Sequence, residues 1–341
     1  MTKANSATES VISRKVLRLA LFILLGIAVY SVGWYFAAEF IRKQIIAFMS
    51  GENPSAVVAS CEDTTLGGYP FRFRLNCASV TIEDHYQGVS TSFGALRAAA
   101  QVYAPGHIIW ELDGPSVTRS SLGFTSTVDW SSLQSSLVLA TEGVDRSSVE
   151  VKDVTATVTA PASPGPVRLT APHFESHVRR QEGNLDFASL IRDAQITLGS
   201  PDAGNLLELP PLSSSIDVTL TGKGALLDPR EAPKQSLYGT TGQIRRFVTD
   251  LGEGRVMTIS GPIAVGEDGL VSGQLNIEIE GLEGWATTAK QLYPEQGETI
   301  DDAMKVLAIL FGGQNNGNAQ LTIREGRVSL GLIPLGRLPP L

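Results

Sequence analysis

The sequence predicts a mainly β protein with extended antiparallel curved sheets or a sandwich, a few helices, and one transmembrane helix at the N-terminus. Three observations predict it: a long uncharged apolar segment, many short segments of alternating apolar and polar residues, and few segments with helical spacing. Charged residues make up 18% of the chain and hydrophobic residues 43%, a composition typical of folded proteins. The net charge of −8 argues against nucleic acid as a partner, because such binding depends on neutralising phosphates.

The apolar segment LALFILLGIAVYSVGWYFAA, residues 19–38, contains no charged side chain. As a helix it would be about 30 Å long, the thickness of a hydrocarbon core. Basic residues flank it on the N-terminal side, so the positive-inside rule predicts that residues 1–18 are cytoplasmic. We therefore expect a single-pass inner-membrane protein, anchored in the lipid bilayer, whose main domain at residues 56–341 is periplasmic.

Two features bear on how this helix ends. A cleaved signal peptide is the alternative to an anchor, but its apolar region normally has about 7 to 15 residues, and Phe36 stands where a small residue is preferred. Apolar residues then continue at helical spacing as far as Phe48, until Pro54 stops the pattern. Residues 39–55 are accordingly predicted as a juxtamembrane helix and linker.

Cys61 and Cys77 are the two cysteines of the chain, and both follow the anchor. Gly67 and Gly68 between them are typical of a hairpin turn. A disulfide is expected, and closing a loop of about 15 residues is worth about 3 kcal/mol in the chain-entropy model. Two buried free thiols are the alternative. A structural zinc site needs four ligands, and no ligand pair lies nearby, so no metal or other cofactor is expected.

Alternating strands fill most of residues 56–341. In YPFRFRLNC, apolar residues on one side alternate with Arg72 and Arg74 on the other, the pattern of a half-buried strand. The two arginines are a candidate contact for an anionic partner, and a solvated edge that discourages aggregation is the alternative. Further strands are predicted at 79–83, 95–103, 107–112, 125–130, 135–140, 148–159, 167–179, 194–198, 215–221, 255–265, 270–280 and 319–332.

Helices are predicted at 240–251, 284–293 and 300–311, with 184–192 as a fourth. The helix at 300–311 is bounded by acidic residues at its start and by two glycines at its end. Its interior is apolar nearly all round, which favours a buried helix or one that covers an apolar surface. Four of its residues are candidates for lining an apolar groove: Ala303, Val306, Leu307 and Leu310.

The composition changes at two proline-containing stretches, 161–166 and 201–211. Either stretch can separate two halves of the domain, and both can equally be loops at the rim of one long sheet. We favour one continuous architecture of two similar lobes.

Three segments carry a resemblance to a known family: GGYPFRFRLNC at 67–77, YAPGHIIWELDGP at 103–115 and LTIREGRVSLGLIPLGRLPPL at 321–341. They resemble the DUF2125 family of uncharacterised alphaproteobacterial envelope proteins. The resemblance implies an inner-membrane anchor and a periplasmic domain, and it supplies no catalytic residues. In architecture alone, the chain is also loosely similar to AsmA-like envelope proteins that handle lipids.

Catalytic and metal signatures are weak in this sequence. His173 and His177 are four residues apart, a spacing that joins two ligands on a helix, but the flanking residues alternate as in a strand. No G-x-S-x-G motif is present. The sequence therefore predicts a non-enzymatic envelope protein that binds lipid or another amphiphile in an apolar groove. The alternative is a structural or interaction module of an inner-membrane complex, with envelope proteins as partners and no small-molecule ligand.

Overall fold

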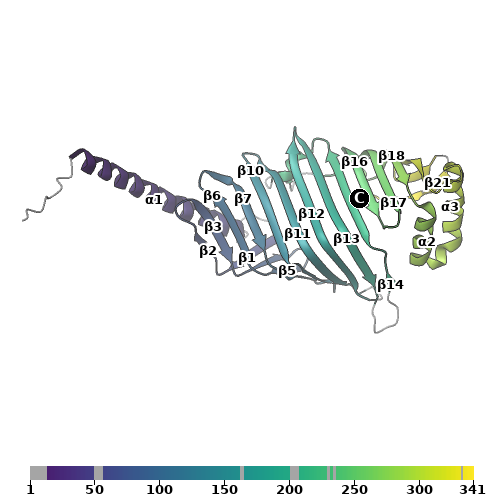
Figure 1. Cartoon of the computed structure of the whole chain (residues 1–341), viewed down its shortest axis with the longest axis horizontal. Coiled ribbons are helices and arrows are strands. Elements are labelled where there is room, and N and C mark those ends of the chain that lie inside the picture. The colour runs from purple at the N-terminus through teal and green to yellow at the C-terminus, as the bar shows by residue number, and fades with distance from the viewer. Residues whose placement is uncertain are drawn as a thin grey trace, which may run out of the picture.

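The computed structural model describes residues 14–49, 57–161, 165–199, 207–228, 231–232, 236–331 and 333–341. In this part of the chain, every strand belongs to one antiparallel sheet. Helix α1 extends from one end of the sheet, and helices α2 and α3 lie at the opposite end (Figure 1). The fold is therefore mainly β with an apolar N-terminal helix, as predicted.

The helices are α1 (Arg14–Met49), α2 (Leu282–Leu292) and α3 (Gly297–Leu310), with short turns η2 (Gly224–Leu227) and η4 (Pro294–Gln296). The strands of the first half are β1 (Val57–Glu62), β2 (Thr65–Gly67), β3 (Arg72–Cys77), β4 (Ser79–Asp84), β5 (Val89–Phe93), β6 (Leu96–Gln101), β7 (Ala104–Leu112), β8 (Ser116–Ser120), β9 (Thr125–Asp129) and β10 (Ser132–Ala140). Those of the second half are β11 (Gly143–Thr159), β12 (Val167–Gln181), β13 (Asn184–Leu198), β14 (Leu207–Glu208), β15 (Leu212–Leu220), β16 (Thr240–Asp250), β17 (Val256–Val265), β18 (Val271–Ile279), β19 (Gly317–Arg324), β20 (Arg327–Leu330) and β21 (Ile333–Arg337).

The first half of the sheet is folded into two panels that share β11. The first panel runs β2-β3-β6-β7-β10, and the second runs β1-β4-β5-β8-β9. Strand β10 pairs with the first part of β11, up to Lys152, and β9 pairs with the last part, from Thr155. Strand β3 of the first panel continues into β4 of the second panel through Ala78 alone. We therefore regard β3 and β4 as one long strand that bends at a corner, as in orthogonally packed sheets.

The corners lie along one line, which we call the crease. Where this line crosses the long strands β11 and β13, the backbone angles are irregular. Asp153 in β11 has a φ of 51° and Asp193 in β13 has a φ of 47°, values that favour short polar side chains. Small or apolar residues beside these points are among the most buried of the chain: Val151, Ala171 and Ala194 are 7%, 2% and 0% exposed. The floor of the crease is therefore where the sheet packs most tightly.

The two faces of the sheet differ in chemistry. Paired residues of neighbouring antiparallel strands point to the same face. One register row runs Phe73, Ala100, Ile108, Leu137, Ser147, Val178, Phe187, Val218 and Ile244, and its continuation at the far end is Leu275, Leu321, Leu330 and Ile333. The opposite face carries polar rows such as Lys152, His173 and Arg192. An apolar face thus extends along the whole sheet.

Cys61 and Cys77 form a disulfide, as predicted. Cys61 belongs to β1 in the second panel, and Cys77 belongs to β3 in the first. The bond therefore crosses the crease at the end of the sheet next to α1, and it places the apolar face on the inside of the fold. We call this inner face the trough.

Among the described residues, no second layer of structure fills the trough along its whole length. Ile82, on the inner face of the second panel, is still 37% exposed. No large side chain is fully buried among the described residues. A compact monomer of this mass exposes about 13,000 Å², whereas the accessible surface here is 21,812 Å². The exposed apolar side chains of helix α1 account for part of the excess.

Two of the four predicted helices are confirmed and two are wrong. Helices α2 and α3 match the predictions at 284–293 and 300–311, but 240–251 forms β16 and 184–192 lies within β13. In β16, a bulge at Arg245 and Arg246 places Ile244 and Phe247 on the same face although they are three residues apart. This spacing imitates the period of a helix, which explains the error.

The two proline-containing stretches lie between neighbouring strands of the sheet. Strands β11 and β12 pair from Val158 and Val167 onward, which brackets the first stretch. Strand β13 pairs with β14 and β15 across the second. Residues 162–164 and 201–206 lie outside the described residues. The division of the domain into two lobes stays a prediction.

Removing the disulfide should destabilise the domain. In the C61S/C77S double variant, we expect the free energy of unfolding to fall by about 2 to 4 kcal/mol, because the unfolded chain regains the freedom that a closed loop removes. Chemical denaturation followed by tryptophan fluorescence would measure this, and reduction of the wild-type protein should cause the same loss. An unchanged denaturation midpoint would show that the crease holds its angle without the bond.

Candidate functional site

The trough is a continuous apolar face of the described sheet, and helix α2 covers part of it. Between α2 and the ends of β13, β15 and β16 lies an apolar cavity of about 290 Å³, close to the lower limit for small-molecule sites. Its sheet wall includes Ile196, Leu212 and Leu251, and its helix wall includes Trp285, Ala289 and Leu292. Because Ile196 and Leu212 point to the inner face, the cavity is a covered section of the trough.

One polar group in this region has no hydrogen-bond partner among the described residues. The indole Nε1 of Trp285 is buried and unpaired. The neighbouring Thr288 is satisfied, because its Oγ1 donates to the carbonyl of Gly284 at 3.1 Å and accepts from Arg255 at 3.3 Å. A buried unpaired donor is costly unless a ligand or water accepts from it. The cavity wall therefore contains one buried donor that no described residue satisfies.

The residues predicted to line a groove lie on α3. Ala303 and Leu310 are exposed, and Val306 and Leu307 are half-buried. None of the four belongs to the wall of the α2 cavity, and their role in binding stays a prediction. Sequence reasoning missed α2 as a lining element, although Trp285, Ala289 and Leu292 are spaced at i, i+4 and i+7, a signal of one helix face.

The predicted alternation of β3 is confirmed at Arg72 and Arg74. Both are exposed on the outer face, opposite the side that carries the buried Phe73. Neither guanidinium forms an ion pair with a described carboxylate. Their contact with an anionic partner stays a prediction.

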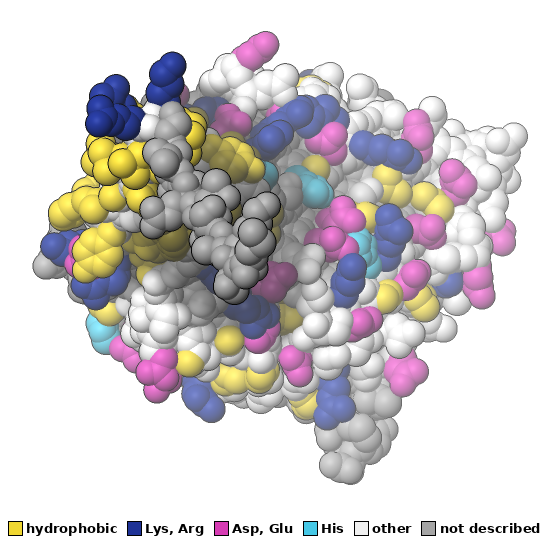
Figure 2. Space-filling model, turned by 60° about the vertical axis from the view of Figure 1, so that its left-hand side comes forward, with side chains coloured by type: hydrophobic (Ala, Val, Ile, Leu, Met, Phe, Trp, Pro, Cys, Tyr) yellow, Lys and Arg dark blue, Asp and Glu magenta, His cyan; other side chains and the backbone are white. Residues whose placement is uncertain are grey.

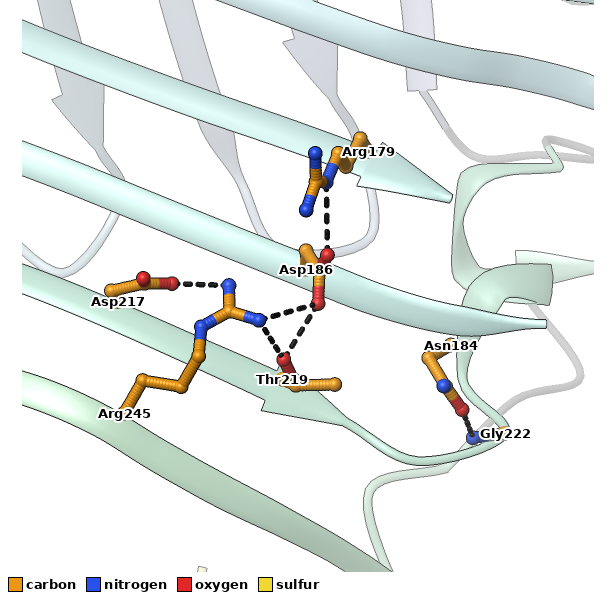
Figure 3. A network of polar contacts seen from close by, with 7 residues as sticks. All are labelled: Arg179, Asn184, Asp186, Asp217, Thr219, Gly222 and Arg245. Carbon is orange, nitrogen blue, oxygen red and sulfur yellow. Dashed lines mark hydrogen bonds and ion pairs between the residues drawn. The ribbon is translucent and has the colours of Figure 1, made fainter. Parts of the chain in front are cut away.

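The outer face is held together by a polar network around Asp186 (Figure 3). Arg179 on β12 donates to Asp186 at 2.9 Å, Thr219 on β15 at 2.6 Å, and Arg245 on β16 at 3.3 Å. Arg245 also donates to Asp217. Since Asp186 is only 7% exposed, these partners tie four neighbouring strands together behind the trough.

The same contacts set the pKa of Asp186. Burial by itself would raise this pKa, but hydrogen bonds from Thr219 and Arg179 and the charges of Arg245 and Arg179 outweigh burial and lower it. The carboxylate is therefore ionised when the fold is intact. The network lies on the face opposite the trough.

His173 and His177 lie on strand β12, as their flanking residues predicted. Both rings contact Glu175, which lies between them: His173 Nε2 is 2.5 Å from Oε1, and His177 Nε2 is 3.3 Å from Oε2. These contacts lower the pKa of Glu175. Among the described residues, no group of three or more His, Cys, Asp or Glu side chains is placed to hold a metal ion.

Removing the charge of Asp186 should destabilise the sheet. We expect D186N to lose about 1 to 3 kcal/mol of unfolding free energy, because the hydrogen bonds to a charged acceptor are lost. D302N, which alters an exposed pair with Lys305, should leave the unfolding free energy nearly unchanged. Chemical denaturation in detergent at neutral pH would compare the two variants.

The pH dependence of stability follows from the direction in which the pKa of Asp186 is shifted. In the folded protein, the pKa of Asp186 is below its ordinary value of 3.8. The contribution of Asp186 to the free energy of unfolding is therefore complete above pH 3.8, and it is lost as the pH falls through the lowered pKa of the folded state. D186N should therefore lose less stability than the wild type on acidification below about pH 4. Parallel losses in both proteins would contradict the assigned role of Asp186.

Comparisons with known proteins agree with the sequence resemblance. The model of a family described as "Uncharacterized protein conserved in bacteria (DUF2125)" matches residues 34–339. No curated protein matches significantly, nor does any solved structure. The loose similarity to AsmA-like proteins therefore has no support from these comparisons. Since the match covers most of the chain, from the last turns of the apolar helix to the final strand, the protein belongs to the DUF2125 family.

Proposed function

We propose that the protein is a membrane-anchored envelope protein that binds a lipid or another amphiphile in the trough. The observation that carries the proposal is the continuous apolar inner face, which no second layer of the described residues fills along its whole length. At about 4.8 Å per strand, the ladder from β3 to β20 extends on the order of 60 Å. Such a surface in contact with water would be costly, and an acyl chain is the kind of ligand that would cover it.

The α2 cavity supports the same ligand class. Its walls are almost entirely apolar, and the one unpaired donor beside it, the Trp285 indole, is buried in the wall. A hydrocarbon chain would occupy this space without leaving a polar group of its own unpaired. A strongly polar ligand would lack partners there.

The membrane setting is part of the proposal. Residues Arg14–Gln44 of α1 are long and apolar enough to cross a membrane, and a disulfide is typical of a protein exposed to an oxidising compartment. We propose that the span crosses the inner membrane, with the N-terminus in the cytoplasm and the sheet in the periplasm. Binding rather than catalysis is the proposed activity, without a cofactor and without nucleic acid as a partner. The bilayer and envelope components are the proposed partners.

Filling the α2 cavity should reduce lipid binding. In A289W, the added indole would occupy the space between α2 and the sheet, at a stability cost of about 1 to 3 kcal/mol. We expect native mass spectrometry of the gently extracted protein to show bound lipid on the wild type and severalfold less on A289W. The matched control is A303W, since Ala303 is exposed on α3.

The outcomes separate the competing functions. A lipid-free wild-type protein would favour the structural module of a membrane complex and would contradict the proposal. Equal loss of lipid in A303W would place the ligand against α3 instead. Retention of lipid by a folded A289W protein would show that the ligand occupies another part of the trough.

A further inference from the structure

Helix α1 contacts the sheet at β3 and at the loop between β2 and β3. Trp34 stacks on Phe73 of β3, with ring centroids 5.6 Å apart, and it meets Tyr69 edge-on at 5.4 Å. Ser31 Oγ lies 2.7 Å from the Tyr69 hydroxyl, and Tyr30 donates a hydrogen bond to the carbonyl of Pro70. Polar and aromatic contacts therefore fix this loop against the apolar helix.

The contacts lie before the C-terminal end of the uncharged segment of α1, which places the loop relative to the membrane. Tyr30, Ser31 and Trp34 precede Ala38, the last residue of the uncharged segment, by four to eight positions. At 1.5 Å per residue, this corresponds to about 6 to 12 Å along the axis. If the uncharged segment fills the hydrocarbon core, these contacts lie inside the edge of that core, so the loop between β2 and β3 is within the leaflet and not above the membrane.

The loop presents apolar surface outward at that depth. Phe71 is 73% exposed and Tyr69 is 50% exposed. The neighbouring turn between β6 and β7 adds Tyr103, which is 80% exposed, and the two loops are joined by a hydrogen bond from Val102 N to the carbonyl of Phe71 at 3.0 Å. We call Tyr69, Phe71 and Tyr103 the aromatic tip. Aromatic residues are enriched where proteins cross the membrane–water interface.

The surroundings of the aromatic tip are consistent with a membrane surface. With the α1 end of the molecule turned forward, apolar side chains gather over α1, and charged side chains are scattered over the sheet beyond it (Figure 2). Arg72 follows Phe71 directly, is exposed, and forms no ion pair with a described carboxylate. A guanidinium in this position can reach phosphate groups of lipids while its stem stays on apolar surface.

We infer that the aromatic tip is a second membrane contact, inserted into the leaflet from which α1 emerges. The contact holds the near end of the sheet against the bilayer, so that the disulfide-clamped end of the trough adjoins the lipid. This inference rests on the membrane setting given under the proposed function, and it adds the place where an amphiphile would pass between bilayer and trough.

The experiment places the environment-sensitive fluorophore dansylalanine at Phe71 in the full-length protein, reconstituted in vesicles of phosphatidylethanolamine and phosphatidylglycerol. The same residue placed at Ile309, which is 79% exposed on α3 at the opposite end of the sheet, is the matched control. Lipids with a nitroxide near the headgroup serve as quenchers. We expect quenching at position 71 to exceed that at position 309 by roughly threefold or more.

A second labelled position, Tyr103, tests whether the quenching at Phe71 is a local effect of the fluorophore. Tyr103 should give the same result as Phe71, because it belongs to the same aromatic tip. Quenching at positions 71 and 103 no greater than at 309 would overturn the inference. Native mass spectrometry of the same preparations measures lipid occupancy separately. Quenching without bound lipid would therefore contradict only the proposed function, and bound lipid without quenching would contradict only the aromatic tip.

Discussion

The rest of the structure depends on one constraint: paired residues of adjacent antiparallel strands point to the same face of the sheet. Each strand contributes apolar residues at alternate positions, and the register joins these positions into rows such as Phe73, Ala100 and Ile108. A shift of one residue in any strand would turn its apolar residues outward. The continuity of the trough is thus a property of register over many strands, and bulges such as that at Arg245 and Arg246 preserve it where the spacing changes.

The crease converts this two-faced sheet into a concave one. Ala171 and Ala194 at its floor are small and buried, so neighbouring strands can approach closely there, and the Cys61–Cys77 bond joins the two panels at the end near α1. On the convex side, the network of Asp186 joins β12, β13, β15 and β16 through charged hydrogen bonds. Polar contacts therefore stiffen the outside, while the inside remains apolar and open.

Local signals made several features predictable from the sequence. The uncharged segment, the single pair of cysteines and the alternation around Arg72 and Arg74 each need only neighbouring residues to be interpreted. The helix expected at 240–251 failed because a bulge gave Ile244 and Phe247 helical spacing within a strand. The crease, the α2 cavity and the partners of Asp186 depend on pairing between strands that are distant in sequence, and such pairing has no local signature. The contact of the loop between β2 and β3 with α1 is equally hard to predict, since it joins residues about 40 positions apart in the sequence.

The most direct test of the trough as a lipid-binding surface is photocrosslinking at positions on its two faces. Benzoylphenylalanine would replace Phe174 and Phe247 on the inner face, and Arg192 and Thr258 on the outer face. After irradiation of the protein in its native membrane, the proposed function predicts lipid adducts at Phe174 and Phe247, detected by mass spectrometry, and none at the outer positions. Equal adduct formation on both faces, or protein adducts alone at the inner positions, would contradict it.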